Sequence, residues 1–144
     1  MLANVTLGSL LILVTVFIHT IGIGLLAHAM PHVVHWFRLH RDYFRQTVAV
    51  MAIVLGLFIL HTIEIWLWAA AFVWVGAVGN FPDALYFSTV TFSTLGYGDI
   101  VAAPDWRLFA AFEAMDGFIL LGWSISYLIA ASMRHGPFRP GEHF

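Results

Sequence analysis

The chain alternates between long apolar runs and short polar segments. Residues 5–30 carry no formally charged side chain, and residues 47–78 contain only His61 and Glu64 as ionisable groups. A third apolar run covers residues 106–131. At about 1.5 Å per residue, each run is long enough to cross a hydrocarbon core of about 30 Å as a helix. The pattern therefore predicts three transmembrane helices.

Composition supports a membrane protein. Of 144 residues, 61% are hydrophobic and only 10% are charged, with a mean hydropathy of +0.89, whereas soluble domains carry about 25% charged residues. The absence of cysteine excludes disulfide and thiolate chemistry. The net charge of −2 is too small to indicate a nucleic-acid partner. The first run lacks the basic start of a signal peptide and exceeds its usual apolar length, so we interpret it as a transmembrane helix.

The polar segments predict the orientation. Pro31 is expected to end the first helix and to begin a basic amphipathic connector over 31–46, and the tail over 132–144 is short and polar. Arginine-rich segments next to spans tend to face the cytoplasm, so we expect the connector and the tail inside and the N-terminus outside. The arginines concerned are Arg38, Arg41, Arg45, Arg134 and Arg139.

A short segment separates the second and third spans. After a turn at 79–83, Asp83 is expected to cap a helix over 84–93. Ten residues cannot cross the membrane, which favours a re-entrant helix. The next residues, 94–99, read TLGYGD. Irregular backbone at membrane depth is tolerated where it is buried in protein or lines a watery cavity. This segment is therefore predicted to line a pore.

The residue types in TLGYGD suit an ion path. Gly96 and Gly98 can adopt positive φ without steric penalty, and alternating backbone handedness aims successive carbonyls toward one axis. Rings of carbonyl oxygens can replace the hydration shell of K⁺, and the Thr94 hydroxyl adds a further oxygen. Tyr97 is expected to point away from the axis as a brace. Asp99 would lie at the outer mouth, either hydrogen-bonded behind the loop or attracting cations.

TLGYGD, preceded by ALYFSTVTFS and followed by an apolar helix, resembles the selectivity filter of the pore-loop potassium channels. The closest type is the bacterial two-transmembrane ion channel, here with an additional N-terminal helix. The resemblance covers a pore domain at 47–131, with outer helix 47–78, pore helix 84–93, filter 94–99 and inner helix 106–131. It implies an all-α membrane protein in which four copies, a homotetramer, surround one pore.

The resemblance also implies roles for single residues. Potassium sites are expected at Thr94, Leu95, Gly96, Tyr97 and Gly98; filter support from Asp99, Tyr86 and Thr91; and a gating hinge at Gly117 or Gly122. Leu95 replaces the common valine, a mild departure because that position contributes its carbonyl. Val90 stands where some members carry a pore-helix glutamate that pairs with the filter aspartate.

The same resemblance sets the functional class. It implies passive conduction of K⁺ across the cell (inner) membrane, with K⁺ as the only metal, no organic cofactor and no enzymatic activity. Membrane lipids are expected partners. Gating is expected to come from the filter, the bend at Gly117 or Gly122, lipid, pH or a separate regulatory protein. A weakly selective cation channel and a non-conducting membrane sensor subunit are the alternatives.

Four ionisable residues fall inside the predicted spans. His61 and Glu64 share a face of the second span, and Glu113 and Asp116 lie at a comparable depth in the third. Intramembrane ionisable residues usually face protein or water. We hypothesise that Glu113, with Glu64 or His61, forms a hydrogen-bonded network behind the filter. In the alternative, these acids are packing residues satisfied by nearby hydroxyls or held protonated.

The remaining features concern the first span and the connector. Gly8, Ser9, Gly22 and Gly24 could let the first helix pack closely against a neighbour, although a lipid-facing strut is the alternative. Four histidines cluster around the first polar turn, without the cysteine or carboxylate that would complete a strong metal pattern. Histidine titrates near neutrality, so pH sensing suits them better. They are His28, His32, His35 and His40.

Overall fold

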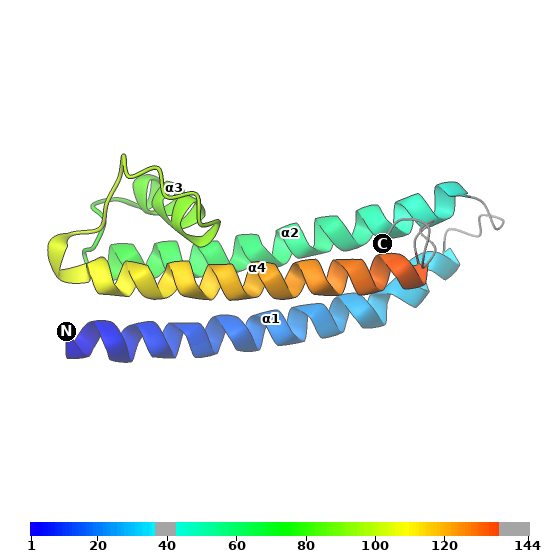
Figure 1. Cartoon of the computed structure of the whole chain (residues 1–144), viewed down its shortest axis with the longest axis horizontal. Coiled ribbons are helices and arrows are strands. Elements are labelled where there is room, and N and C mark those ends of the chain that lie inside the picture. Colours follow the sequence, from blue (N-terminus) through cyan, green and yellow to red (C-terminus); the bar gives the residue numbers. More distant parts are fainter. Residues whose placement is uncertain (37–42, 136–144) are drawn as a thin grey trace.

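The computed structural model describes residues 1–36 and 43–135, and within these ranges it contains helices and loops without a strand. The helices are α1 (Leu2–Trp36), α2 (Tyr43–Trp74), α3 (Phe81–Phe92), the 3₁₀ turn η1 (Pro104–Trp106) and α4 (Arg107–His135). The three long helices run lengthwise beside one another, and α3 lies at the end that also carries the N-terminus (Figure 1). The predicted all-α architecture is confirmed.

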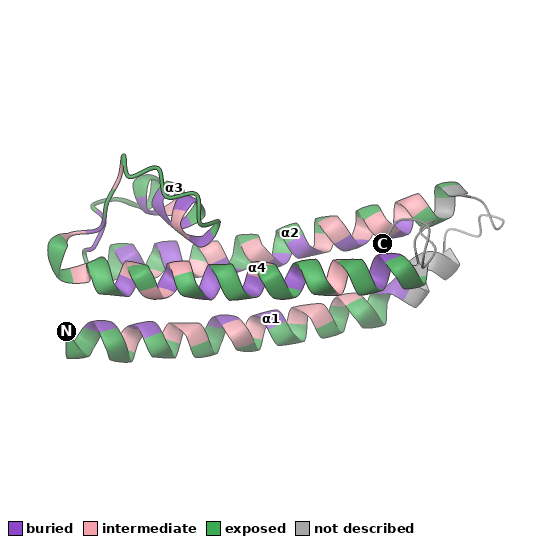
Figure 2. Ribbon diagram, viewed as in Figure 1, coloured by how far each residue is buried: buried purple, intermediate pink, exposed green. Residues whose placement is uncertain are grey.

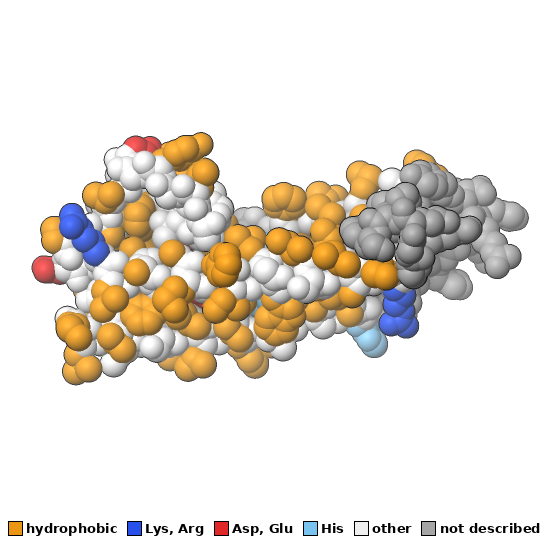
Figure 3. All heavy atoms as spheres, in the orientation of Figure 1, with side chains coloured by type: hydrophobic (Ala, Val, Ile, Leu, Met, Phe, Trp, Pro, Cys, Tyr) orange, Lys and Arg blue, Asp and Glu red, His pale blue; other side chains and the backbone are white. Residues whose placement is uncertain are grey.

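Three described helices are long and apolar enough to cross a membrane, at Leu2–Met30, Gln46–Trp74 and Pro104–Arg134. Exposed hydrophobic side chains cover much of the visible face along these helices, whereas the coloured charged groups lie toward its two ends (Figure 3). The additional N-terminal helix is thus a membrane span of its own. The chain is a membrane protein.

The ends of α1 and α2 differ from the prediction. Pro31 does not end α1, which continues to Trp36, because membrane helices can tolerate the hydrogen bond that a proline removes. α2 ends at Trp74, short of residue 78, because Gly76 adopts φ +72. There, the Ala77 N–H bonds to the carbonyl of Phe72 at 2.9 Å, and this pairing is typical of a Schellman C-cap.

The start of α3 also differs. Its N-cap is Asn80 and not Asp83, and the helix begins at Phe81. The Asn80 side chain accepts a hydrogen bond from the Asp83 backbone N–H at 2.9 Å, and Pro82 in the first turn needs no such partner. Asp83 instead lies in the first turn, where its charge suits the helix dipole.

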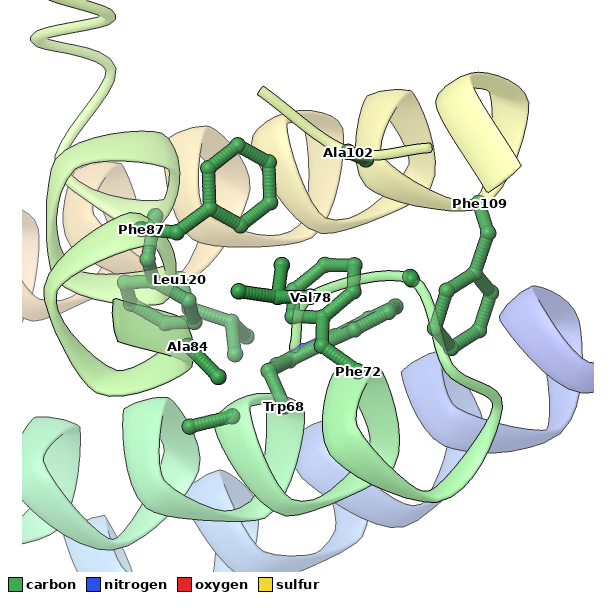
Figure 4. Close-up of a cluster of buried hydrophobic side chains, with 11 residues drawn as sticks. Trp68, Phe72, Val78, Ala84, Phe87, Ala102, Phe109 and Leu120 are labelled. Atoms are coloured by element: carbon green, nitrogen blue, oxygen red, sulfur yellow. The ribbon is translucent and has the colours of Figure 1, made fainter. Parts of the chain in front are cut away.

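An aromatic core fixes α3 to the bundle (Figure 4). The ring of Phe72 in α2 lies between Phe87 of α3, at a centroid distance of 5.0 Å, and Phe109 of α4, at 5.3 Å. The ring of Trp68 packs against those of Phe72 and Phe109. Phe87 therefore belongs to this core. Toward the opposite end of the bundle, a second buried cluster joins α1, α2 and α4 (Figure 2) through Met30, Ala49, Ile53, Leu57 and Ala131.

α1 packs through small and polar residues. Added Cβ atoms would lie 2.7 Å from Phe112 at Gly8 and 2.5 Å from Leu60 at Gly22, so both glycines permit close helix contact. Gly24 has open space around it and Ser9 is exposed, so neither residue lies at a helix contact. One face of α1 is thus docked on α2 and α4, while the rest of the helix exposes apolar side chains.

Asn4 fastens the start of α1 to the start of α4. Its side-chain amide donates to the carbonyl of Asp105 at 3.0 Å and accepts from the N–H of Phe109 at 3.0 Å. Residues 31–36 and 43–46 of the predicted connector belong to α1 and α2, and residues 132–135 of the predicted tail extend α4. Residues 37–42 and 136–144 lie outside the described residues, as do the side chains of His32, His35 and His40. His28 is exposed on α1.

Candidate functional site

The loop after α3 is held by its own N–H groups. Thr94 N–H bonds to the carbonyl of Thr91 at 3.0 Å, and the N–H groups of Leu95 and Gly96 both bond to the carbonyl of Val90, at 3.0 and 3.1 Å. The C-terminal turn of α3 thereby holds the start of the loop. Among the described hydrogen bonds, none is accepted by a backbone carbonyl of residues 94–98.

The backbone of this loop alternates in handedness. φ is +61 at Thr94, +58 at Gly96 and +76 at Gly98. The two glycines adopt the positive φ predicted for them. Thr94 was not predicted to do so, and a non-glycine residue in this region stores about 1–3 kcal/mol of strain. Alternate residues with positive φ turn the peptide groups so that successive carbonyls share one side of the loop.

The side chains of Leu95 and Tyr97 in this loop are exposed in a single chain. Leu95 is 55% exposed and Tyr97 is 68% exposed, although both lie in a segment set between membrane spans. Irregular backbone at such a place needs protein or water around it. The described residues of one chain thus leave these loop side chains uncovered, open to water or to other protein.

Tyr86 and Asp99 are joined behind the loop. The Tyr86 hydroxyl donates to Asp99 Oδ2 at 2.8 Å. This hydrogen bond lowers the pKa of Asp99 and raises the pKa of Tyr86. A hollow of about 120 Å³ adjoins the pair and is bordered by Val90, the position that lacks an acid. Tyr86 therefore provides the partner for the aspartate that Val90 cannot.

Glu113 binds α3. It lies fully buried on α4 and is hydrogen-bonded to the hydroxyl of Ser88 on α3, which also lies 2.9 Å from the carbonyl of Ile65 on α2. A hydroxyl has one hydrogen and the carbonyl can only accept. A protonated Glu113 that donates to Ser88, which donates to Ile65, satisfies both contacts. Glu113 Oε2 has no hydrogen-bond partner among the described residues.

Asp116 forms a second cluster. Its Oδ2 accepts from the Thr15 hydroxyl at 2.6 Å and from the Trp68 indole N–H at 3.0 Å. All three side chains are buried, and they come from α4, α1 and α2 respectively. The acid of the inner helix is thus bound to the additional N-terminal helix.

A third cluster, here called the polar ring, consists of His19, His61, Glu64 and Ser124. The two oxygens of Glu64 meet His19 Nδ1 at 2.8 Å and His61 Nδ1 at 2.9 Å. Ser124 Oγ lies 2.9 Å from His61 Nε2 and 3.4 Å from His19 Nε2. The four contacts close on themselves and join α1, α2 and α4.

The polar ring also contains the one group of three potential metal donors found among the described residues, His19, His61 and Glu64, with donor atoms within 4.8 Å of one another. Two histidines and a carboxylate suit Zn²⁺ chemically. The separations of 2.8 and 2.9 Å, however, are those of hydrogen bonds, and each carboxylate oxygen faces a different imidazole. The geometry is that of a hydrogen-bonded ring.

The two hinge candidates have different surroundings. A Cβ at Gly117 would lie 2.2 Å from the carbonyl oxygen of Phe92, the last residue of α3, whereas one at Gly122 would meet nothing within 4 Å. α4 is continuous through both positions. Gly117 therefore allows close approach to α3, and a hinge at either position stays a prediction.

The structure divides the network predicted behind the loop. Glu113 contacts α3 through Ser88 and makes no described hydrogen bond with Glu64 or His61, which belong to the polar ring. Sequence analysis missed the partners of these acids. The missed residues are Thr15, His19, Trp68, Ser88 and Ser124.

A signal for part of this set was present in the sequence. The polar or small residues Asn4, Gly8, Thr15, His19 and Gly22 recur at helical spacing in the first span. Such residues in a membrane helix usually face other helices.

One comparison with known proteins gives a match. A protein-family model described as "Ion channel" matches residues 47–134, more than half of the chain. Neither a curated protein nor a solved structure matches.

Proposed function

Because the chain belongs to the ion channel family, we propose that it forms a potassium-selective channel, with K⁺ passing through a pore lined by residues 94–98. The observation that carries the proposal is the alternation of positive φ at Thr94, Gly96 and Gly98. This backbone leaves a row of carbonyls without hydrogen-bond donors. Carbonyl rings of this kind can replace the hydration shell of K⁺.

The short helix supports cation binding electrostatically. α3 ends at Phe92, directly before the loop. The C-terminal end of a helix carries about half a negative charge from its unpaired carbonyls. A cation at the foot of the loop would interact favourably with that end. Conduction through such a site is passive and requires no chemical step or organic cofactor.

We propose four copies per pore. Leu95 and Tyr97 are exposed in one chain, and a carbonyl-lined filter of this type needs four loops around an axis. Tyr97, pointing away from the axis, would then contact protein of the same or a neighbouring copy. Tyr86, Thr91 and Asp99 support the loop from behind, and membrane lipids cover the exposed apolar face of α1.

The proposed orientation follows the arginines. With the connector and the tail on the cytoplasmic side of the cell (inner) membrane, the N-terminus and the loop face outside. The structure is compatible with this, because the N-terminus and α3 share one end of the bundle (Figure 1). A separate protein is a further proposed partner for gating.

The test is flux from liposomes that contain the purified protein. Gly96→Ala is the decisive variant, since φ is +58 there and no atom lies within 4 Å of a new Cβ, so that the backbone alone is perturbed. Gly79→Ala is the matched control, because its surroundings are equally open and it needs no positive φ. We expect selective K⁺ flux in the control and its loss in Gly96→Ala. Equal flux and equal K⁺/Na⁺ ratios in both would refute the proposed path.

Two further measurements separate the alternatives. Reversal potentials in mixed K⁺ and Na⁺ distinguish a selective from a weakly selective channel. The mass of the detergent-solubilised complex tests for four copies. A folded protein without flux under any ionic condition would favour the non-conducting subunit.

A further inference from the structure

The polar ring has an unusual proton count. Glu64 as a carboxylate only accepts hydrogen bonds, so both histidines must present Nδ1–H to it. Neutral imidazoles then offer bare Nε2 atoms to Ser124, one at 2.9 Å and one at 3.4 Å. The serine hydroxyl has one hydrogen and can satisfy only one of them. With neutral histidines the ring is therefore one donor short.

One additional proton completes the ring. An imidazolium donates Nε2–H to Ser124 Oγ, and the serine hydroxyl donates to Nε2 of the other histidine. Every contact of the ring then joins a donor to an acceptor. The single positive charge also offsets that of Glu64, which is fully buried together with His19. Buried charges are costly unless they are paired in this way.

We propose that the polar ring is a binding site for one proton and that the bound proton clamps α4, the inner helix of the pore, to α1 and α2. Ser124 is the only member of the ring on α4, so movement of α4 away from α1 and α2 breaks its contacts with both histidines. Release of the proton at high pH leaves a buried net negative charge and an unpaired acceptor. The clamp then weakens, and α4 moves more easily.

The groups around the ring favour this proton. Asp116 on α4 interacts electrostatically with Glu64 and His19 and adds negative character. Glu113 lies beyond Asp116 and binds α3 instead. Farther along α4, Tyr127 packs against the cluster around Met30.

Two aromatic rings lie beside the polar ring. Trp123 of α4 lies 5.3 Å from the His19 ring, and Phe92 of α3 lies 5.8 Å from the His61 ring. α2 contributes His61 and Glu64, and α1 contributes His19.

A route for proton exchange exists at His61. Its side chain is 12% exposed, unlike the fully buried Glu64. It borders two hollows of about 210 and 380 Å³. The larger reaches Thr89 and Ser93, directly below the loop. Water in the larger hollow, where Thr62, Thr89 and Ser93 add hydroxyl groups, can therefore exchange protons with the ring.

The first experiment measures the proton without relying on conduction. Purified protein with ¹⁵N-labelled histidine is examined by NMR from pH 5.5 to 9, and its thermal unfolding is followed over the same range. We expect one imidazolium within the ring at the acidic end. Because the folded state holds this proton, its stability is present at low pH and falls as pH rises, by up to about ten-fold per pH unit in the unfolding equilibrium.

Variants assign the effect to the ring. His19→Gln and Ser124→Ala should flatten this pH dependence. His28→Gln changes an exposed histidine of the same helix, and Ser126→Ala an exposed serine of α4, so both controls should retain it. Should the first two variants fail to fold, the ¹⁵N spectrum of the unsubstituted protein decides. Two neutral ring histidines that both carry their hydrogen on Nδ1 throughout, or stoichiometric Zn²⁺ in the purified protein, would overturn the inference. One neutral ring histidine with its hydrogen on Nε2 would place the bound proton on Glu64 and preserve the site.

The second experiment links the ring to the proposed channel function, on which the role of α4 in gating rests. K⁺ flux should rise with pH, by up to about ten-fold per unit, the limit for one released proton. Ser124→Ala should conduct at a high, pH-independent level. An intact pH dependence of flux in Ser124→Ala would overturn the clamp. An NMR signature of the bound proton without any flux would instead preserve the proton site and refute the channel.

Discussion

The substitution Gly117→Ala tests how closely α4 is fitted against α3. A Cβ at this position would lie 2.2 Å from the carbonyl oxygen of Phe92 and 2.8 Å from its carbonyl carbon, while ordinary contact begins at 3.4 Å. The carbonyl must therefore move by at least about 1.2 Å. The neighbouring carbonyls of Val90 and Thr91 hold the start of the loop, so the displacement reaches the proposed ion path.

The expected cost follows from two opposing effects. Overpacking of a tight site costs about 1–3 kcal/mol, and the upper end applies here because the obstacle is backbone. Replacement of a helical glycine by alanine returns about 1 kcal/mol. The net loss of about 2 kcal/mol corresponds to a change of up to about 30-fold in the unfolding equilibrium.

The assay compares thermal unfolding of Gly117→Ala and Gly122→Ala in detergent, followed by circular dichroism. Gly122 lies on the same helix with no atom within 4 Å of a new Cβ, so its variant should be at least as stable as the unsubstituted protein. In liposomes, only Gly117→Ala should alter the K⁺/Na⁺ ratio. Equal stability of the two variants would show that α4 does not approach α3 as described.

Three other substitutions have defined outcomes. Tyr86→Phe removes the hydrogen bond that lowers the pKa of Asp99. In the unsubstituted channel the Asp99 carboxylate therefore stays ionised until the external pH falls through this lowered pKa. The variant should protonate Asp99, and so lose flux, at a higher external pH. Ser88→Ala leaves Glu113 without its partner on α3 and should cost about 1–3 kcal/mol in thermal stability. Asn4→Ala removes two contacts between α1 and α4 and should speed hydrogen exchange at the start of α4.

Two of these substitutions have a control variant, and the third has a defined refuting result. Ser126→Ala removes an exposed hydroxyl bonded only to its own helix, and it should not change stability as Ser88→Ala does. Thr6→Ala does the same on α1 and should leave exchange in α4 unchanged. Identical acid midpoints with and without the Tyr86 hydroxyl would show that its bond to Asp99 does not support the loop.

Local chemistry predicted much of this protein. Length and hydropathy located the three spans, and the glycines at 96 and 98 adopt the positive φ predicted for them. The predicted positions of the helix ends were less accurate where more than one residue could act as a cap. Asn80 displaced Asp83 as the cap of α3, and Gly76 ended α2 early.

The partners of the buried acids could not be read from local sequence. Thr15 lies 101 residues from Asp116, and His19 lies 105 residues from Ser124. Their pairing depends on the rotation of three helices about their axes, which hydropathy does not determine. The positive φ of Thr94 was equally hidden, since threonine has no intrinsic preference for it and the surrounding loop imposes it.

The polar face of α1 has a consequence for biogenesis. Asn4, Thr15 and His19 reach hydrogen-bond partners on α4 that follow them by 101 to 105 residues. At a synthesis rate of about 5–20 residues per second, each of these side chains is made about 5–20 s before its partner on α4. Its polar side chains must spend that interval in lipid, in water or beside the insertion machinery. α1 is thus the first helix made, and although His19 can pair earlier with Glu64 of α2, the docking of its polar face is complete only when α4 arrives.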